Sequence, residues 1–502
     1  MLPDRPLSAI RRLVLVTGAT GYVGARLVGR LLGQGYRVRV LVRDLRRLHS
    51  RPWLNRVEVC EGDALKPETL PQALRDVHTA YYLIHSMAHG EGFVERDISA
   101  ARHFGEAARA ARLSRIIYLG GLGDPGSDLS DHLRSRHLTG DMLRESGIPV
   151  TEFRAAVIVG SGSLSFEMIR YLTERMPVLF CAKWGFTRVQ PISMRNVLQY
   201  LVAALWTPAS IGQIIEIGGA EVLTYLEMML GYAEERGLFR QRLTLPFLPV
   251  WFCANVVNLL TPVPREMAYA LIESLHNEVV VRDPRALTIF PDIRPYDYRT
   301  AVSRALMRLD QGDVESAWSD ALFSTLGDQR PVMLTTQEGM IIEQRQRVVE
   351  APAEDVFHVF SSLGGRQGWL YLNWAWIARG VIDRVLGGVG VIRGRRFADH
   401  VRVGDALDFW RVEDVAEGRM MRLRAEMKVP GSAWLQFDAQ PLGGRRTRLR
   451  QVAYFAPKGL LGLLYWYTLY PVHALLFSGL VRRIAERAEA LARGSRYSRA
   501  AG

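Results

Sequence analysis

The chain has 502 residues, of which 48% are hydrophobic and 23% are charged, a composition that excludes an intrinsically disordered chain. Its length exceeds what one hydrophobic core supports, so we expect two or three domains. Three cysteines without a CxxC pair argue against a disulfide framework or a zinc site, and they fit a cytoplasmic protein.

The net charge of +13 admits nucleic acid, an anionic membrane or an anionic cofactor as a partner. The basic residues are scattered through every predicted element, so we interpret most of them as solvated faces and expect no nucleic-acid partner. Three histidines, His85, His89 and His137, show no metal-ligand spacing with a carboxylate or a cysteine. We therefore expect no metal site.

The first half of the chain alternates short apolar runs with amphipathic ones. The predicted strands are Leu13–Thr17, Arg37–Val42, Val57–Cys60, Ala80–His85, Arg115–Leu119 and Val150–Val159. The predicted helices are Ala25–Leu32, Glu68–Leu74, Phe93–Ala111 and Leu129–Glu145. Short apolar strands separated by amphipathic helices predict parallel βαβ units, and so an α/β fold with a Rossmann-type doubly wound parallel sheet.

Three glycines stand where the first strand ends and the first helix begins, in the stretch LVLVTGATGYVGARLVGRLL. We expect Gly18 to permit the tight turn, Gly21 to let the backbone approach a diphosphate, and Gly24 to allow close packing of helix on strand. The N-terminus of the helix then offers free N–H groups and a positive dipole end to the phosphates. This pattern predicts a dinucleotide site, although a structural turn is the alternative.

Arg43 stands at the end of the second strand, where a site for NAD(H) has a carboxylate for the ribose 2′-hydroxyl. A guanidinium at this position can pair with a 2′-phosphate in a bidentate way. We therefore predict that NADP(H) is preferred and that NAD(H) remains possible, since Asp44 follows directly.

The stretches TGATGYVG, LVRD, EGDALKPETL and IIYLGGLG resemble the atypical short-chain dehydrogenase/reductase superfamily, in its NmrA-like and epimerase-like branch. The resemblance implies a set of residues around the cofactor. These are Thr20, Gly21, Tyr22 and Val23 at the diphosphate, Asp63 and Ala64 at the adenine, and Leu83 and His85 at the nicotinamide ribose. For Leu83, packing in the core is the alternative.

The catalytic set of this superfamily is a serine, a tyrosine and a lysine, and the chain departs from it at all three places. Gly120 and Gly121 occupy the serine slot, His132 the tyrosine position and Arg136 the lysine position. The resemblance also places Asp97 on a helix that reaches toward the site. An imidazole can exchange a proton near neutral pH, whereas an arginine can hold ribose hydroxyls or an oxyanion but keeps its proton. The alternative for all three is a solvated position on a helix.

The first domain is predicted to span residues 1–325, with a substrate lobe from about residue 220. Its aromatic side chains suggest an apolar acyl, prenyl or aromatic substrate, or else a core. They are Trp184, Phe186, Phe247, Trp251 and Phe252.

A second domain is predicted over residues 331–493, and residues 494–502 are expected to form a flexible tail. A strand, a helix and extended segments, among them 389–396, precede a long apolar helix, which is an α+β pattern. The opening RVVEAPAEDVFHVF resembles the START/polyketide-cyclase-like (helix-grip) superfamily. Later motifs look like a bacterial domain of unknown function that recurs fused to atypical short-chain dehydrogenases. Six of the eleven tryptophans lie here and suggest a pocket for a small hydrophobic or lipid-like ligand, or an aromatic core without a cavity.

The segment Gly459–Val481 carries no formal charge over its 23 residues. A buried helix, peripheral contact with a membrane and a membrane span all remain open for it. The protein is accordingly expected to be cytoplasmic, and association with a membrane stays open.

Taken together, these patterns favour an NADP(H)-dependent oxidoreductase or epimerase-like enzyme acting on a small hydrophobic carbonyl compound, with a C-terminal module that binds a hydrophobic ligand. Two alternatives belong to other classes. One is a non-catalytic NADP(H) sensor like the NmrA-like regulators, which the missing serine, tyrosine and lysine favour. The other is a lipid-handling protein at a membrane surface, which the net charge and the apolar segment favour.

Overall fold

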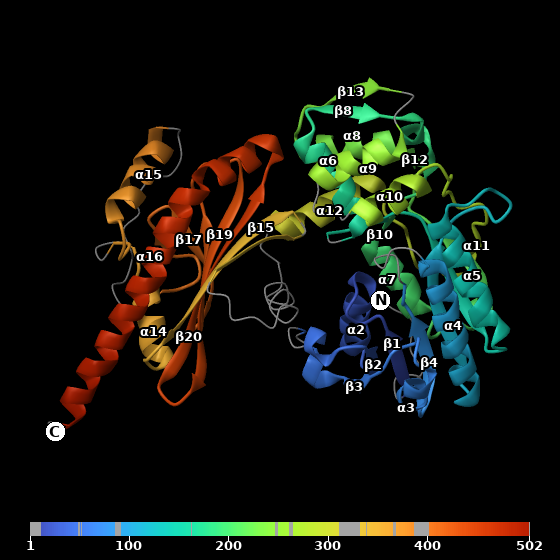
Figure 1. Ribbon diagram of the computed structural model, residues 1–502, viewed down its shortest axis with the longest axis horizontal. Coiled ribbons are helices and arrows are strands. Elements are labelled where there is room, and N and C mark those ends of the chain that lie inside the picture. Colours follow the sequence, from blue (N-terminus) through green and yellow to red (C-terminus); the bar gives the residue numbers. More distant parts are fainter. Residues whose placement is uncertain are drawn as a thin grey trace. The chain divides into compact units, whose positions relative to one another are not determined.

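The structure is a computed structural model that describes residues 12–48, 51, 53–85, 92–161, 163–245, 249–260, 265–310, 332–337, 339–364, 368–385 and 401–500. The chain forms two compact units, Met1–Gly327 and Asp328–Gly502 (Figure 1). The domain boundary predicted between residues 325 and 331 lies outside the described residues.

A parallel seven-stranded sheet forms the centre of the first unit, in the order β11-β6-β5-β4-β1-β2-β3. Its strands are β1 (Leu13–Thr17), β2 (Arg37–Val42), β3 (Glu58–Glu61), β4 (Val77–Tyr82), β5 (Arg115–Gly121), β6 (Val150–Ala155) and β11 (Ile214–Ile217). The predicted doubly wound parallel sheet is confirmed. Strand β11 had no counterpart in the prediction.

Helices cover both faces of this sheet, and the alternating side chains of β1 show why. Val14 and Val16 belong to a cluster with α2 (Tyr22–Gly33) and α7 (Met194–Ala203), whereas Leu13 and Leu15 belong to one with α3 (Leu70–Leu74), α4 (Phe93–Ala110) and α5 (Asp131–Glu145). In Figure 1, α4 and α5 lie side by side next to β4. Each strand is therefore buried on both faces, as expected of a parallel sheet.

Two predicted strands have other bounds in the structure. Strand β4 ends at Tyr82, so Leu83 and His85 lie in the loop that follows it, where the Leu83 N–H donates to the Thr17 hydroxyl at 3.0 Å. The run predicted as one strand from Val150 to Val159 breaks after Ala155, and β7 (Ile158–Val159) leaves the main sheet to pair with β10 (Ile192–Ser193).

The remainder of the first unit is a largely helical lobe. It contains α6 (Leu164–Arg175), α8 (Tyr225–Glu235), α9 (Val250–Leu260), α10 (Arg265–Ser274), α11 (Arg285–Ile289) and α12 (Tyr298–Asp310). Three strand pairs join the lobe, β10 with β7, β12 (Leu223–Thr224) with β9 (Arg188–Val189), and β13 (Gln241–Thr244) with β8 (Val178–Cys181). Helix α6 packs on α8 and α9.

An antiparallel seven-stranded sheet forms the second unit, in the order β14-β15-β20-β19-β18-β17-β16. The strands are β14 (Val332–Gln337), β15 (Met340–Val349), β16 (Ala406–Leu407), β17 (Trp410–Ala416), β18 (Met420–Ala425), β19 (Gly431–Gly443) and β20 (Arg446–Pro457). The helices are α14 (Ala353–Ser361), α15 (Asn373–Val385) and α16 (Gly459–Ala500). The expected α+β class is borne out by this sheet, while the segment 389–396 lies outside the described residues.

Helix α16 closes the second unit by packing on α14, β15 and β20 (Figure 1). It runs to Ala500, so the tail expected from residue 494 is helical in the structure. Alanines and arginines after residue 490 are good helix formers, which explains the continuation. Among the described residues, Gly459–Arg493 is the one helix long and apolar enough to cross a membrane, and 28% of its most apolar window is buried.

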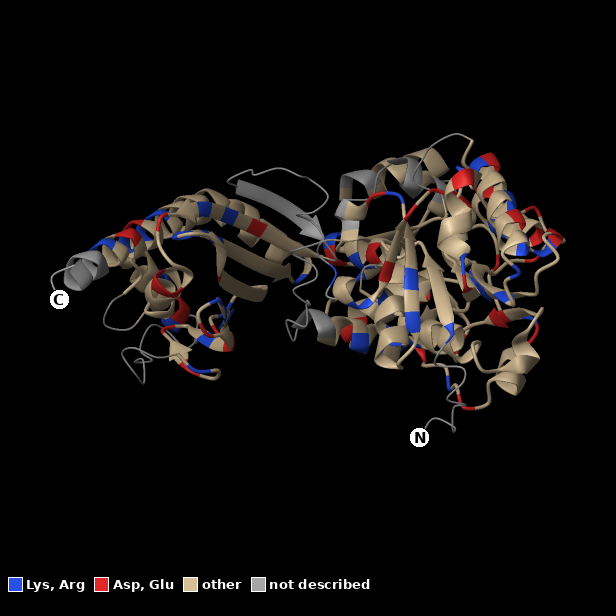
Figure 2. Ribbon diagram, turned by 90° about the horizontal axis from the view of Figure 1, so that it is seen from below, with Lys and Arg blue, Asp and Glu red and all other residues tan. Residues whose placement is uncertain are grey.

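Charged residues of both signs are interspersed over the described elements of each unit (Figure 2). This distribution agrees with the interpretation of most basic residues as solvated faces.

Candidate functional site

The candidate site of the first unit lies at the carboxyl ends of β1 and β4. These two strands are neighbours at the point where the strand order changes direction, since the chain runs from β1 to β3 on one side and from β4 to β6 on the other. Ligands of open α/β sheets bind at this switch point. The loop Gly18–Gly21, the start of α2 and the loop after β4 meet here.

The glycines hold the backbone in contacts that no side chain would allow. Gly18 has a φ of +64°, and a Cβ atom on it would lie 2.5 Å from the carbonyl oxygen of Leu83. A Cβ atom on Gly24 would lie 2.3 Å from the carbonyl oxygen of Gly18. The Gly21 N–H donates to that same oxygen at 2.9 Å, which closes the turn. Helix α2 therefore begins directly against the glycine loop.

The N-terminus of α2 is open to an anion. Its N-cap residue is Gly21, which has no side chain to cap the first N–H groups, and the first turn of the helix holds no acidic residue. Free N–H groups and the positive end of the helix dipole are what a diphosphate requires. Next to this end, the Arg26 guanidinium lies 4.2 Å from the centre of the Tyr22 ring and donates to the Ser161 carbonyl at 3.0 Å.

Two arginines lie at the rim of the candidate site, in the segment that follows β2. Arg43 follows the last residue of β2 and is exposed, as a residue that meets a 2′-phosphate must be. Arg51 donates to the carbonyl of Thr20 at 3.1 Å, and so it ties the glycine loop to the segment after β2. The sequence analysis missed Arg51, because only the fold brings it beside a loop 31 residues earlier in the chain.

The residues expected at the adenine shape a turn after β3. The Asp63 carboxylate accepts from the Leu65 N–H at 3.1 Å, and the Asp63 N–H donates to the Thr69 hydroxyl at 3.0 Å. Ala64 is buried. Asp63 therefore has a structural role in this turn, and its place at the adenine stays a prediction.

Near the expected ribose position, Leu83 is half-buried and packs against the core, whereas His85 is exposed. The core packing left open for Leu83 is thus seen, and its carbonyl oxygen also faces Gly18, while its place beside the nicotinamide ribose stays a prediction.

His132 differs from the expected proton donor. The side chain is half-buried, and burial, followed by the positive charge of Arg136, lowers its pKa from 6.5 to about 3. The imidazole is therefore neutral at neutral pH, and it can donate a hydrogen bond but is not an acid there. Because the side chain is half-buried, it is only partly open to solvent.

Arg136 packs beside the slot that the superfamily gives to serine. A Cβ atom on Gly121 would lie 3.0 Å from a methyl group of Leu133 and 3.5 Å from the Arg136 side chain. The slot is thus filled by α5. Arg136 also influences the buried Tyr118, whose hydroxyl donates to the Arg136 carbonyl at 2.9 Å and whose pKa burial raises to about 12.

Asp97 is buried in the interface of α4 and α5 and is not the surface carboxylate that the alternative supposed. Its Oδ2 atom accepts from the Ser135 hydroxyl at 3.0 Å. Its Oδ1 atom is buried without a hydrogen-bond partner among the described residues. The structure therefore joins Asp97 to Ser135 and not to His132.

Beneath this site lies a buried charge cluster that the sequence analysis did not find. Glu152 is fully buried and pairs with Arg144 and with Arg154, the latter at 2.7 Å. A Cβ atom on Gly140 would lie 2.5 Å from the Glu152 carboxylate, so this glycine makes room for it. The cluster fixes α5 on β6 and so the position of His132 and Arg136.

The aromatic residues expected to line the substrate lobe differ in their exposure to solvent. Phe186, Trp251 and Phe252 are exposed, Trp184 is half-buried, and Phe247 lies outside the described residues. Three large apolar side chains thus remain at the surface of this lobe, which is compatible with an apolar substrate.

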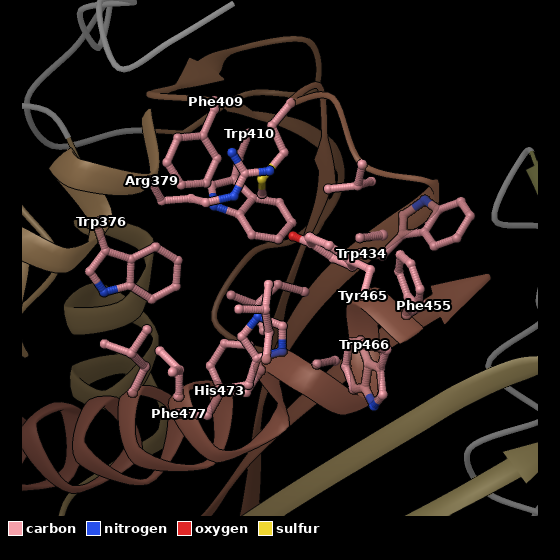
Figure 3. Close-up of a pocket in the computed structure, with 18 of the residues that line it drawn as sticks. Trp376, Arg379, Phe409, Trp410, Trp434, Phe455, Tyr465, Trp466, His473 and Phe477 are labelled. Carbon is pink, nitrogen blue, oxygen red and sulfur yellow. The ribbon is translucent and has the colours of Figure 1, made fainter. Parts of the chain in front are cut away.

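The second unit contains a partly open cavity of about 150 Å³ between α15, α16 and the sheet (Figure 3). Its walls are mostly aromatic, and they include Trp376, Phe409, Trp410, Phe455, Trp466 and Phe477. An aromatic core without a cavity, the alternative at the sequence level, is therefore contradicted.

Comparison with known proteins gives a family for each unit. Residues 18–161 match the family described as NAD(P)H-binding, and residues 341–480 match a family described as protein of unknown function (DUF2867). A ceramide reductase of Caulobacter vibrioides is 31% identical over 244 residues, which are 47% of this chain and 74% of that protein. A (4-alkanoyl-5-oxo-2,5-dihydrofuran-3-yl)methyl phosphate reductase of Streptomyces griseus is 29% identical over 216 residues, 43% of this chain and 71% of that protein.

Among solved structures, the triphenylmethane reductase of Citrobacter sp. complexed with NADP(H) is 21% identical, with a TM-score of 0.48. The alignment covers 58% of this chain and 99% of that one.

Proposed function

This chain belongs to the NAD(P)H-binding family, and we propose that it is an NADPH-dependent reductase, or an epimerase-like enzyme, acting on a hydrophobic carbonyl compound. The glycine loop at the switch point of the sheet is the observation that carries the proposal. Gly18 and Gly24 bring backbone N–H groups to the place where a diphosphate binds in this fold. The reductase names of the two similar relatives support the direction of the reaction.

The residues at the rim fit NADPH better than NADH. Arg43 is exposed at the end of β2, and a guanidinium there can receive the 2′-phosphate in a bidentate way. Arg51, bound to the Thr20 carbonyl, keeps the glycine loop in place and adds a second positive charge nearby. When bound, the nicotinamide supplies a hydride to the carbonyl carbon of the substrate.

The chain's own residues then act on the carbonyl oxygen. We assign to Arg136 the stabilisation of the developing negative charge, because a guanidinium remains charged and donates hydrogen bonds. His132 is neutral with its pKa at about 3, so it orients the substrate oxygen through an N–H group. The proton that completes the alcohol then comes from water.

The second unit, in this proposal, is a helix-grip module that holds an apolar ligand, either a substrate or a product of the first unit. Its antiparallel sheet, long closing helix and aromatic cavity support this role. We propose a cytoplasmic protein whose α16 touches a membrane peripherally, which would suit a lipid-like substrate.

A specific observation favours a second candidate, an NADP(H) sensor without turnover. The serine slot is filled by Leu133, and none of the four lysines of the sequence lies in α5. The two functions are separated by titrating NADPH into the full chain by calorimetry, and by following NADPH oxidation with long-chain ketones, quinones and enones. Binding with turnover supports the reductase, and binding without turnover supports the sensor. The absence of binding refutes both.

A further inference from the structure

Two polar side chains enter the cavity of the second unit from opposite helices. Arg379 comes from α15 and His473 from α16, and Figure 3 shows both among the aromatic rings that line the cavity. The first unit and its cofactor site contribute none of the lining residues.

Both side chains carry a buried nitrogen without a hydrogen-bond partner among the described residues. These atoms are Nη1 of Arg379 and Nδ1 of His473. The Nη2 atom of Arg379 does donate, to the carbonyl of Lys428 at 3.2 Å. Nη1 of Arg379 forms an ion pair with the buried Asp383 carboxylate at 4.0 Å, which is longer than a hydrogen bond. The same Asp383 oxygen accepts from the Lys428 N–H. Buried polar groups are nearly always paired, so these two atoms point to an absent partner.

The cavity wall is mostly apolar and offers few polar atoms to a ligand. Arg379 is the one formally charged residue among the twenty described residues that line it, and none of these twenty carries a carboxylate. The indole N–H groups of Trp376, Trp410 and Trp466 are also buried without a partner in the described part of the chain. A ligand that complements this wall brings acceptor atoms or a negative charge.

The volume limits the ligand to about one ring. An apolar cavity of about 150 Å³ in another protein holds one benzene molecule, and the cavity here measures about 150 Å³. Phe455 and Trp466 are stacked, with 5.2 Å between their ring centres. Aromatic side chains of this kind offer a flat face on which the ring of a ligand can stack.

We propose that this cavity binds a small aromatic or alicyclic carboxylate whose carboxylate accepts hydrogen bonds from Nη1 of Arg379 and Nδ1 of His473. The assignment rests on the proposed ligand-binding role of the second unit and adds the chemical class of the ligand. The electrostatics agree with it. Burial, followed by the charge of Arg379, lowers the pKa of His473 to about 4, so its ring is neutral and one tautomer presents an Nδ1–H group.

The test compares benzoate with benzyl alcohol, a neutral molecule of similar size, by calorimetry on the full chain. We expect benzoate to bind, and the Arg379→Met variant to weaken benzoate about tenfold or more while benzyl alcohol changes little. His473→Phe, which keeps the flat ring stacked on Phe477, should weaken benzoate by a smaller factor. Arg384→Met on the exposed side of α15 is the matched control and should leave both ligands unchanged.

Each outcome decides a different part of the proposal. If benzyl alcohol binds and benzoate does not, or if Arg379→Met leaves benzoate affinity unchanged, the carboxylate assignment is wrong and the module can still bind apolar molecules. If neither probe binds, the ligand-binding role is wrong as well. Near-ultraviolet circular dichroism checks the fold of each variant, and Arg379→Lys, which keeps the charge without the planar fork, should recover only part of the benzoate affinity. NADPH titration stays an independent readout of the first unit.

Discussion

Replacing Gly24 by alanine should separate the folding of the first unit from its ability to hold a dinucleotide. The new Cβ atom would lie 2.3 Å from the Gly18 carbonyl oxygen and 2.8 Å from its carbon, where ordinary contacts begin at 3.4 Å. Both atoms belong to the backbone, so no side chain can turn away. Helix α2 and the glycine loop must therefore separate by about 1 Å.

The cost in stability follows from two opposing effects. Overpacking of this kind costs about 1–3 kcal/mol, and the better helix propensity of alanine returns about 1 kcal/mol. We thus expect the free energy of unfolding to fall by about 0–2 kcal/mol. The affinity for NADPH should fall by more, because hydrogen bonds from N–H groups to a charged phosphate contribute about 1.5–3 kcal/mol each. Losing one of them weakens NADPH about tenfold to a hundredfold.

Gly29→Ala is the matched control in the same helix. No atom lies within 4 Å of a Cβ placed there, so the substitution should stabilise the protein by about 0.5–1 kcal/mol and leave NADPH affinity unchanged. Urea unfolding measures the stability of both variants, and calorimetry measures their affinity for NADPH. Wild-type affinity in Gly24→Ala would show that the dinucleotide does not lie on this loop.

Three further predictions concern Arg43, His132 and helix α16. Arg43→Ala should weaken NADPH about tenfold and NADH little, as measured by calorimetry, and equal losses for both would contradict the 2′-phosphate assignment. His132 has a folded pKa of about 3 against 6.5 in water, so its contribution to stability is present above pH 6.5 and is lost as the pH falls below it. In His132→Gln, the free energy of unfolding measured with urea should change less between neutral and mildly acidic pH than in the wild type. If it changes with pH as steeply as in the wild type, the ring is not buried. Replacing the exposed Leu461 and Leu464 by serine should reduce sedimentation with anionic vesicles, and a wild-type chain that never sediments would refute membrane contact.

The features that follow from local backbone conformation and from the pattern of apolar residues could be predicted from the sequence. The spacing of Gly18, Gly21 and Gly24 predicts the loop because a missing Cβ atom has the same consequence in every environment. Likewise, the alternation of apolar strands with amphipathic helices predicts the parallel sheet, since each strand must bury both faces. The edge strand β11 was missed, because four residues, Ile214–Ile217, give too short a signal beside a turn.

Features that depend on distant neighbours could not be read in the same way. Arg51 meets the Thr20 carbonyl only after β2 and the following segment have folded back on the loop. His132 has an ordinary position at the start of a helix in the sequence, and only its packing and the charge of Arg136 lower its pKa. Six tryptophans predict an aromatic interior, but the packing of α15 against α16 decides whether that interior holds a void.

The candidate sites of the two units share one feature, a guanidinium group that can bind a negative charge. In the first unit, Gly121, His132 and Arg136 stand in place of the serine, tyrosine and lysine of the superfamily's catalytic set, so the only permanent charge in these three positions is a guanidinium. In the second unit, a guanidinium is also the one formal charge among the described residues that line the cavity. Each unit could therefore bind a negative group by itself, Arg379 a carboxylate in the second unit and Arg136 the oxygen being reduced in the first. An aromatic or alicyclic keto acid should therefore bind to the second unit more tightly than its neutral ester, a comparison that calorimetry can make directly.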